Sequence, residues 1–261
     1  MTPSDANSPG RVRREPPRLR TVTVDSLTPL SPYMIRATVT GAELSGFEQP
    51  EPAASVRLLV PGPGTSELVI PEWNGNEFLL PGGERPTIRT FTPRRFDPGS
   101  LELDLDIVLH EGGAISAWAL AAGPGDPVAV SGPGRGYQID PDARSFFLAG
   151  DETAIPAIDQ LLEEMRPDAA VRVIIEIAHP AARRRLPVPS GADIAWVERT
   201  PDTLPGSALV AAVGDVTVEP GTRVWVAGEA GSLVAIRRHL FDALGLERPN
   251  VTVRGYWKYG R

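Results

Sequence analysis

The spacing of apolar residues changes near residue 140, and this change constrains the fold more than any other feature of the sequence. From Leu19 to about Tyr137 the apolar residues come in short runs, and in the run 101–109 every odd position is apolar while Glu102, Asp104 and Asp106 lie between. That period of two is typical of half-buried antiparallel strands. Six such runs separated by Pro-Gly turns predict a small barrel or sandwich. The runs cover residues 19–24, 33–40, 55–60, 87–92, 101–109 and 127–131, with one helix over 114–122.

After residue 140 the pattern becomes strand, helix, strand, which favours a parallel α/β layer. Strands are predicted at 145–149, 171–178, 223–227 and 251–254, and a helix at 154–165 carries one apolar stripe. Ser232 is expected to cap a second helix. The predicted fold class is thus a β-barrel plus α/β, with domains at 18–140 and 141–261. The Arg- and Pro-rich leader 1–17 is expected to be disordered.

Composition excludes several classes of chemistry. The chain has no cysteine, so it forms no disulfide, thiolate zinc site, iron–sulfur cluster or Cys nucleophile. Its three histidines, at 110, 179 and 239, lack metal-ligand spacing, and no metal site is predicted. A net charge of -7 argues against nucleic-acid binding, although the Arg-rich leader is either a solvated tail or a nucleic-acid arm. Redox chemistry would therefore need a borrowed cofactor.

The sequence also bears on location. No apolar run approaches the roughly 18 to 20 residues that span a bilayer, so no integral membrane segment is predicted. The N-terminus has no apolar core of signal-peptide length. We expect a cytoplasmic protein.

Two segments of the first half could bind an anion. In Arg89-Thr90-Phe91-Thr92, strand alternation puts a cation and an aromatic ring on one face, which suits an anionic planar ligand. The alternative is a solvated Arg beside a core Phe. In 110–118, two glycines precede a helix whose free N–H groups could hold a pyrophosphate, with His110 and Ser116 beside it. A plain strand-to-helix turn is the alternative.

Three segments of the second half are candidates for nucleotide contacts. Gly150 to Ala154 ends the first strand, where open sheets bind ligands, although Asp151 could equally be a helix cap. Glu229 ends another strand and either reaches a ligand bound at that edge of the sheet or merely starts a helix. The triplet 183–185, all Arg, either reads a 2′-phosphate or is a solvated loop. No Gly-x-Gly-x-x-Gly fingerprint follows the strand, so nicotinamide binding is expected to be weak.

The motifs described above occur along the chain together with Asp106 to His110 and with Gly-Tyr-Trp-Lys-Tyr-Gly at 255–260. This order of motifs resembles the siderophore-interacting protein family of ferredoxin-reductase-like flavoenzymes. The resemblance implies an FAD-binding barrel followed by an NAD(P)H-binding-like domain, with FAD and either NADPH or NADH as cofactors. It implies a ferric siderophore as substrate and leaves a ferredoxin-type donor possible.

The resemblance also assigns residues. The cofactor-binding residues that it implies are Arg89, Thr90, Phe91, Thr92, Asp106, Val108, His110, Gly113, Ala114, Ser116, Asp151, Thr153, Ala154, Glu229 and Trp257. Basic residues for the chelate carry over to Arg57, Arg135 and Lys258. The family usually has Tyr at position 91 and Pro-Ala at 114–115, so this chain lacks one hydroxyl and has a bulkier Ile115.

The function that the resemblance implies is flavin-dependent reduction of ferric siderophores, in which electrons pass from a nicotinamide or protein donor through FAD to chelated Fe(III). No protein residue is expected to be catalytic, because the flavin carries the chemistry. Two alternatives stay open: a general flavin oxidoreductase with another acceptor, and a ferric-siderophore-binding protein without catalysis.

Overall fold

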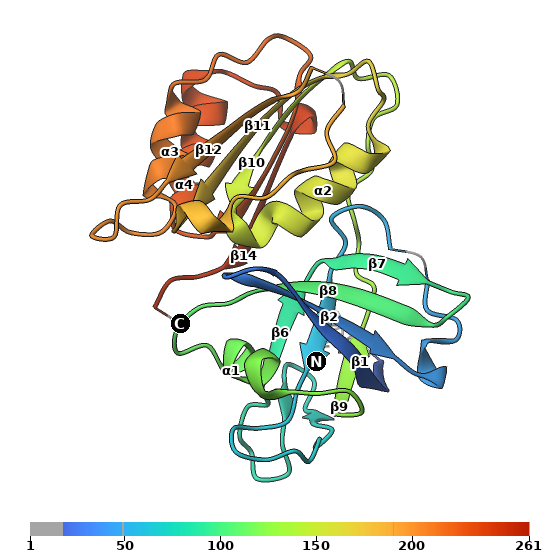
Figure 1. The fold of residues 1–261 in the computed structure, drawn as a ribbon. Coiled ribbons are helices and arrows are strands. Elements are labelled where there is room, and N and C mark those ends of the chain that lie inside the picture. Colours follow the sequence, from blue (N-terminus) through green and yellow to red (C-terminus); the bar gives the residue numbers. More distant parts are fainter. Residues whose placement is uncertain (1–17, 49, 190, 261) are drawn as a thin grey trace, which may run out of the picture.

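The computed structural model describes residues 18–48, 50–189 and 191–260 and shows two sheets stacked end to end (Figure 1). The leader 1–17, predicted to be disordered, lies outside the described residues. No helix within the described ranges is long and apolar enough to cross a membrane.

Seven antiparallel strands form the first sheet, in the order β6-β3-β9-β1-β2-β8-β7. Their bounds are β1 Leu19–Ser31, β2 Met34–Thr40, β3 Val56–Leu59, β6 Ile88–Phe91, β7 Pro93–Asp97, β8 Glu102–Val108 and β9 Pro127–Ser131. A ribbon of β4 (Glu72–Trp73) and β5 (Phe78–Leu79), a 3₁₀ turn at Ala42–Leu44 and the helix α1 (Ala114–Ala121) complete this half.

This sheet curls into a half-barrel around its own apolar core (Figure 1). Its two edge strands, β6 and β7, are consecutive in the chain and are separated by Thr92 alone. Thr92 therefore lies at the seam of the barrel, where it is 7% exposed.

Five parallel strands form the second sheet, in the order β12-β11-β10-β13-β14. Their bounds are β10 Ser145–Asp151, β11 Ala170–Ile177, β12 Asp193–Glu198, β13 Arg223–Glu229 and β14 Val251–Trp257. The helices are α2 (Ile155–Glu164), α3 (Ser207–Gly214) and α4 (Ser232–Arg238), which runs on into a π-helical turn at His239–Ala243. Short 3₁₀ turns span Glu152–Ala154, Pro180–Ala182 and Arg248–Asn250.

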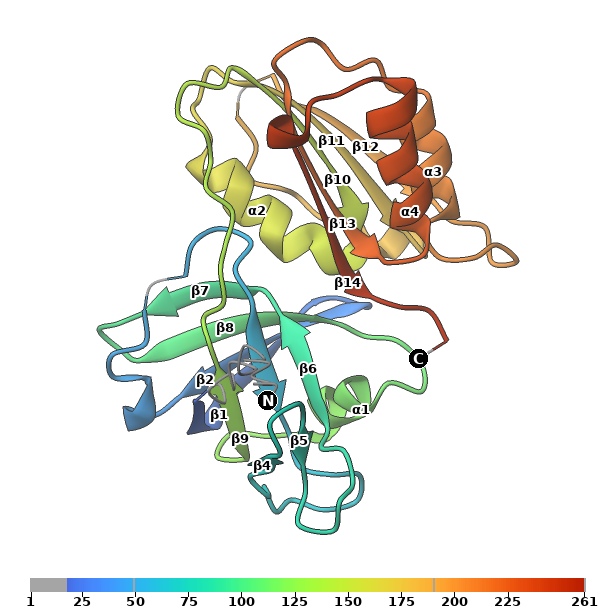
Figure 2. The same cartoon turned by 180° about the vertical axis from the view of Figure 1, so that it is seen from behind.

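The helices cover the two faces of this sheet separately. Helix α2 packs on one face and α3 with α4 on the other, each over its own apolar core (Figures 1 and 2). The carboxyl ends of the parallel strands point toward the barrel, so the loops that leave them lie at the junction of the two sheets (Figure 2).

The predicted fold class is confirmed, and each of the six predicted barrel runs contains a strand. Among the helices and strands, five were not predicted: β4, β5, β7, β12 and α3. The expectation that Ser232 caps α4 was wrong, because Gly231 is the N-cap residue and makes no side-chain cap bond. Ser232 lies one position further on, where its hydroxyl donates to the Glu229 carbonyl oxygen at 2.8 Å.

Candidate functional site

Strand β6 presents the Arg89 to Thr92 segment at the edge of the barrel. Arg89 and Thr90 are exposed, Phe91 is half-buried and Thr92 is buried. The Arg89 guanidinium donates only to the carbonyl of its own neighbour, Ile88, at 2.8 Å. A charged group that is exposed and lacks an acidic partner among the described residues is available to an anionic ligand.

Helix α1 lies beside this strand, because Phe91 packs against the same apolar core as Ile115 and Ala119 of α1 (Figure 1). The N-cap residue of α1, Gly113, has no side chain, and no side-chain cap bond is made there. The first N–H groups of the helix are therefore free for an anion such as a phosphate.

The imidazole of His110 packs directly on Gly113. A Cβ added to Gly113 would lie 2.4 Å from His110 Cε1, so the imidazole would have to move away to admit it. The Ser116 hydroxyl accepts the backbone N–H of His110 at 3.0 Å. This bond closes the turn between β8 and α1. The hydroxyl proton of Ser116 is not used in the bond, so it stays available to donate to a ligand.

An exposed guanidinium, a half-buried aromatic ring and an uncapped helix N-terminus on one side of the barrel fit a dinucleotide with a planar ring system. Of the residues that the resemblance assigns to FAD, the structure brings together those on β6 and those at 110–116. The roles of all these residues stay predictions.

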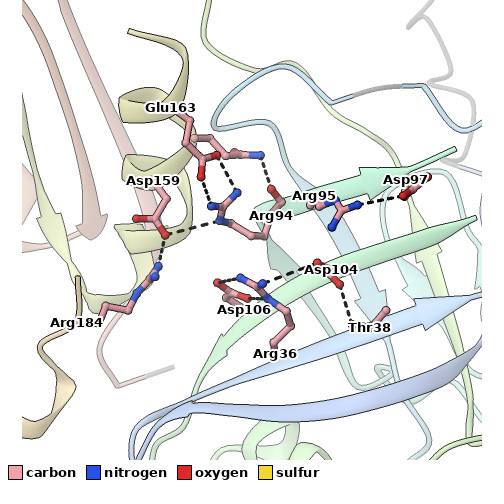
Figure 3. A network of polar contacts seen from close by, with 11 residues as sticks. Arg36, Thr38, Arg94, Arg95, Asp97, Asp104, Asp106, Asp159, Glu163 and Arg184 are labelled. Atoms are coloured by element: carbon pink, nitrogen blue, oxygen red, sulfur yellow. Dashed lines mark hydrogen bonds and ion pairs between the residues drawn. The ribbon is translucent and has the colours of Figure 1, made fainter. Parts of the chain in front are cut away.

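Asp106 and Val108 of β8 instead lie on the face of the sheet that is turned toward α2, opposite Leu103, Leu105 and Ile107 in the barrel core. Both Asp106 carboxylate oxygens accept from the Arg36 guanidinium, Nε to Oδ1 at 2.7 Å and Nη2 to Oδ2 at 2.9 Å (Figure 3). Val108 pairs with Met34 and packs against the core under α2. Both side chains thus lie at the junction of the barrel with the α/β layer.

Asp151 joins three strands at the carboxyl edge of the parallel sheet. Its Oδ1 accepts the Thr153 N–H at 2.9 Å and the Thr153 hydroxyl at 2.5 Å. Its Oδ2 accepts the Glu229 N–H and the Trp257 indole N–H, both at 2.8 Å. Burial raises the pKa of Asp151, and these four donors partly offset the rise. Of its two predicted roles, capping is confirmed, while a nicotinamide contact stays a prediction.

Glu229 and Glu176 also take up backbone N–H groups at this edge. Glu229 accepts from Ser232 at 2.7 Å and from Tyr259 at 3.2 Å, and although burial opposes it, such N–H contacts hold its pKa below the usual value. Glu176 accepts the N–H groups of Gly206 and Leu209 at the start of α3.

In many α/β proteins the free N–H groups at helix N-termini bind phosphates. Here carboxylates of the chain itself accept from these N–H groups. This agrees with the absence of a glycine fingerprint after β10. The small side chain of Ala154 is buried beside Gly150, where a Cβ on the glycine would lie 2.4 Å from that of Ala154.

The three basic residues assigned to the chelate lie on different elements. Arg57 lies opposite Thr90 in the β3–β6 pair, and its guanidinium carbon is 6.0 Å from the centre of the Phe78 ring. Arg135 is exposed in the loop after β9, which packs against Ser55 through Gly134. Lys258 is exposed directly after β14. Convergence of the three on one chelate stays a prediction.

The arginine triplet is largely engaged. Arg183 pairs with Glu198, and Arg184 turns inward to pair with Asp159 (Figure 3). Arg185 is the exposed member without an ion-pair partner among the described residues. The solvated-loop interpretation fits Arg183 and Arg185, and a three-guanidinium phosphate site does not form.

An ion-pair network joins α2 to the barrel, and the sequence patterns did not predict it. Arg94 of β7 contacts Glu163 at 2.5 Å and Asp159 at 3.6 Å (Figure 3). Burial raises the pKa of Asp159 to about 6, against the pull of Arg184 and Arg94. Arg94 is 69 positions from Glu163, and Arg184 is 25 positions from Asp159, so no local pattern could have paired them.

Further bonds join the two sheets. The Gln160 side chain of α2 donates to the Pro93 carbonyl at 2.6 Å and accepts the Ala53 N–H at 3.0 Å. Arg254 of β14 donates to the Ala53 carbonyl at 2.8 Å and to the Gly136 carbonyl at 2.6 Å. These bonds hold α2 and β14 against the start of β7 and the loops that contain Ala53 and Gly136.

The comparisons with known proteins agree with this arrangement. Residues 23–137 match the model described as "Siderophore-interacting FAD-binding domain", and residues 143–260 match the model "Siderophore-interacting protein". The chain therefore belongs to the siderophore-interacting protein family.

Individual relatives carry corresponding names. The chain is 30% identical over 236 residues to the ferric vibriobactin reductase ViuB of Vibrio cholerae, covering 89% of this chain and 86% of that one. It is 28% identical to the NADPH-dependent ferric-chelate reductase of Escherichia coli, over 95% and 96% of the two chains. A crystal structure of a siderophore utilization protein from T. fusca superposes with a TM-score of 0.83 at 35% identity, over 95% of both chains.

Proposed function

We propose that the protein reduces ferric siderophores with FAD as its cofactor, moving electrons from NADPH or NADH to chelated Fe(III) and releasing Fe(II). The observation that carries this proposal is the pairing of the exposed Arg89 on β6 with the uncapped N-terminus of α1, on either side of the half-buried Phe91. The family membership and the reductase names of two relatives support it.

In this proposal each element has a separate task. Arg89 and the start of α1 hold the pyrophosphate, and Phe91 lies against the flavin ring. Bound FAD would supply the conversion of a two-electron hydride donor into a one-electron donor, so that one NAD(P)H would reduce two Fe(III) and release one proton. Arg57, Arg135 and Lys258 attract the anionic chelate to a protein whose net charge is -7.

Iron needs no site of its own in the protein. Across the described residues, no group of three or more His, Cys, Asp or Glu side chains could hold a metal ion. The metal enters within its chelator and leaves when reduction weakens the oxygen ligation. We place the reaction in the cytoplasm, and a ferredoxin-type protein stays an alternative donor.

The test is anaerobic turnover of ferric chelates by the FAD-loaded protein, with free flavin and quinone as competing acceptors. Replacing Arg57, Arg135 and Lys258 by Ala should raise KM for the ferric chelate and leave quinone turnover unchanged. Arg172→Ala is the matched control, since Arg172 is an arginine on β11 that pairs with Asp193 of β12. Equal effects on both acceptors would favour a general flavin oxidoreductase.

A further inference from the structure

Arg254 belongs to β14 of the α/β layer, but its guanidinium bonds to two loops of the barrel half. Its Nη1 donates to the Ala53 carbonyl at 2.8 Å and its Nη2 to the Gly136 carbonyl at 2.6 Å. Hydrogen bonds from a charged donor are stronger than neutral ones, and the planar fork of an arginine fixes the geometry of its acceptors. Arg254 therefore ties the loop 51–55 to the loop 132–137.

The loop 51–55 depends on the α/β layer for its shape. Ala53 is buried and has a φ of 54°, in the left-handed region that residues other than glycine rarely adopt. Its N–H donates to the Gln160 side chain of α2 at 3.0 Å, and its carbonyl accepts from Arg254. Both backbone polar groups of Ala53 are thus bonded by side chains of the α/β layer, which stabilise an otherwise unfavourable conformation.

Arg135 lies in the loop 132–137 between two glycines that pack tightly against the loop 51–55. The Gly134 N–H donates to the Ser55 carbonyl at 2.6 Å, and the Gly136 N–H donates to the Glu51 carboxylate at 3.1 Å. A Cβ on Gly136 would overlap the Cβ of Glu51, so the two loops meet without room for a side chain. The backbone on both sides of Arg135 is therefore held, while its own side chain is exposed.

Arg57 and Arg135, the two barrel residues assigned to the chelate, are held by different means. Arg57 lies inside the sheet, where β3 pairs with β6 on one side and with β9 on the other, so ladder bonds fix its backbone. Arg135 lies outside the strands, where the bonds to its two neighbouring glycines replace the ladder. Loss of Arg254 should therefore release Arg135 and leave Arg57 in place.

We propose, on the basis of the proposed function, that Arg254 is a positioning residue for the substrate: it bonds to the Ala53 and Gly136 carbonyls and thereby holds Arg135 where its guanidinium meets the anionic oxygen ligands of the ferric chelate. Arg254 acts through the backbone of the two loops and does not contact the chelate itself. Recognition of the chelate by the barrel then depends on its contact with the α/β layer.

The first measurement is the rate at which trypsin cleaves between Arg135 and Gly136, followed by mass spectrometry, because it reports on the loop without any flavin. Cleavage requires the backbone to open locally, and the hydrogen bonds at Gly136 oppose that opening. Arg254→Met keeps a long side chain and removes both donors, so this cleavage should become at least about tenfold faster. Arg237→Met is the matched control, since Arg237 of α4 donates to another carbonyl of β14, that of Val253 at 3.3 Å, and it should leave the rate unchanged.

The second measurement is the KM of the FAD-loaded protein for a tris-catecholate chelate of Fe(III), at saturating NADPH. R254M and R135A should each raise this KM about three- to tenfold and leave kcat within about twofold of wild type, whereas a loss of folded protein would lower the apparent kcat instead. The double variant R254M/R135A should have the KM of R135A alone, because both changes act through one contact. The effects of R254M and R57A should multiply.

Glu51 supplies a second pair of variants with the opposite electrostatic sign. E51A removes the acceptor of the Gly136 N–H and should raise both the cleavage rate and KM, although the loss of a negative charge would by itself lower KM for an anionic chelate. E51Q keeps an acceptor oxygen and should not raise KM. A higher KM in E51A alone therefore assigns the effect to the hold on the loop rather than to charge.

Faster cleavage in R254M with an unchanged KM, or effects of R254M and R135A on KM that multiply, would overturn the role of Arg254 and leave the proposed function intact. A wild-type protein that does not reduce the chelate would overturn the proposed function and the substrate role with it, while the trypsin assay would still show whether Arg254 holds the loop. The two failures are therefore distinguishable.

Discussion

Replacing Asp151 by Asn tests whether this carboxylate is a structural hub or a nucleotide contact. The carboxylate accepts four hydrogen bonds, two at each oxygen, from Thr153, Glu229 and Trp257. An asparagine has one acceptor oxygen, and its amide group faces donors at the other position.

The amide can turn in two ways, with different costs. Turned toward Thr153, it faces the backbone N–H of Thr153, while the hydroxyl can reverse and accept. Turned the other way, it faces the N–H groups of both Glu229 and Trp257. At least one buried N–H therefore loses its acceptor, at about 1 to 3 kcal/mol, and the remaining bonds lose the strengthening effect of the charge. Relief from burying a charge offsets part of this, so we expect a net loss of about 2 kcal/mol.

Denaturant unfolding followed by far-ultraviolet circular dichroism measures this loss, with D202N, at an exposed aspartate, as the control. D202N should change the unfolding free energy by less than about 0.5 kcal/mol. If D151N unfolds like wild type but binds NADPH more weakly, the hub interpretation fails and Asp151 contacts the nucleotide.

Three further predictions follow from single contacts. Gly113→Ala should weaken FAD binding at least about tenfold, because the new Cβ would lie 2.4 Å from His110 Cε1 and push the imidazole out of its place. An unchanged dissociation constant for FAD would count against the α1 site. Phe91→Tyr should tighten FAD binding about threefold by adding a donor, as titration of the apoprotein would show. Burial raises the pKa of Asp159 from 3.8 to about 6, so the folded state binds this proton more tightly than the unfolded state. As pH rises from about 4 to about 6, the free energy of unfolding of wild type should fall by about 3 kcal/mol relative to that of D159N. If the unfolding free energies of the two proteins change in parallel with pH, the prediction is refuted.

The sequence predicted those elements whose pattern is local. Alternation gave β8 and the apolar stripe gave α2, each to within a few residues. Strand β7 was missed because Pro93 and two arginines resemble a loop, although Pro93 is tolerated at the edge of the sheet. Helix α3 was missed because Ser207–Gly214 is apolar on most sides and shows no clear polar face. The domain boundary at residue 140 stays a prediction.

For the site, sequence motifs located the segments but not the bonds within them. Nothing in the order of residues shows that Asp151 accepts from Trp257, more than 100 positions away. This pairing comes from the parallel sheet, which brings the carboxyl ends of β10 and β14 to one edge. The sequence motifs therefore predicted which ligands the site binds, and the tertiary structure shows which side chains are free to contact them.

The most direct test of the central claim is the visible spectrum of the purified protein after reconstitution with FAD and desalting, followed by photoreduction and anaerobic addition of a ferric siderophore. The account predicts that flavin bands are retained and that the chelate reoxidises the reduced flavin with formation of Fe(II). A colourless protein, or a reduced flavin that ferric siderophores leave unchanged, would contradict it.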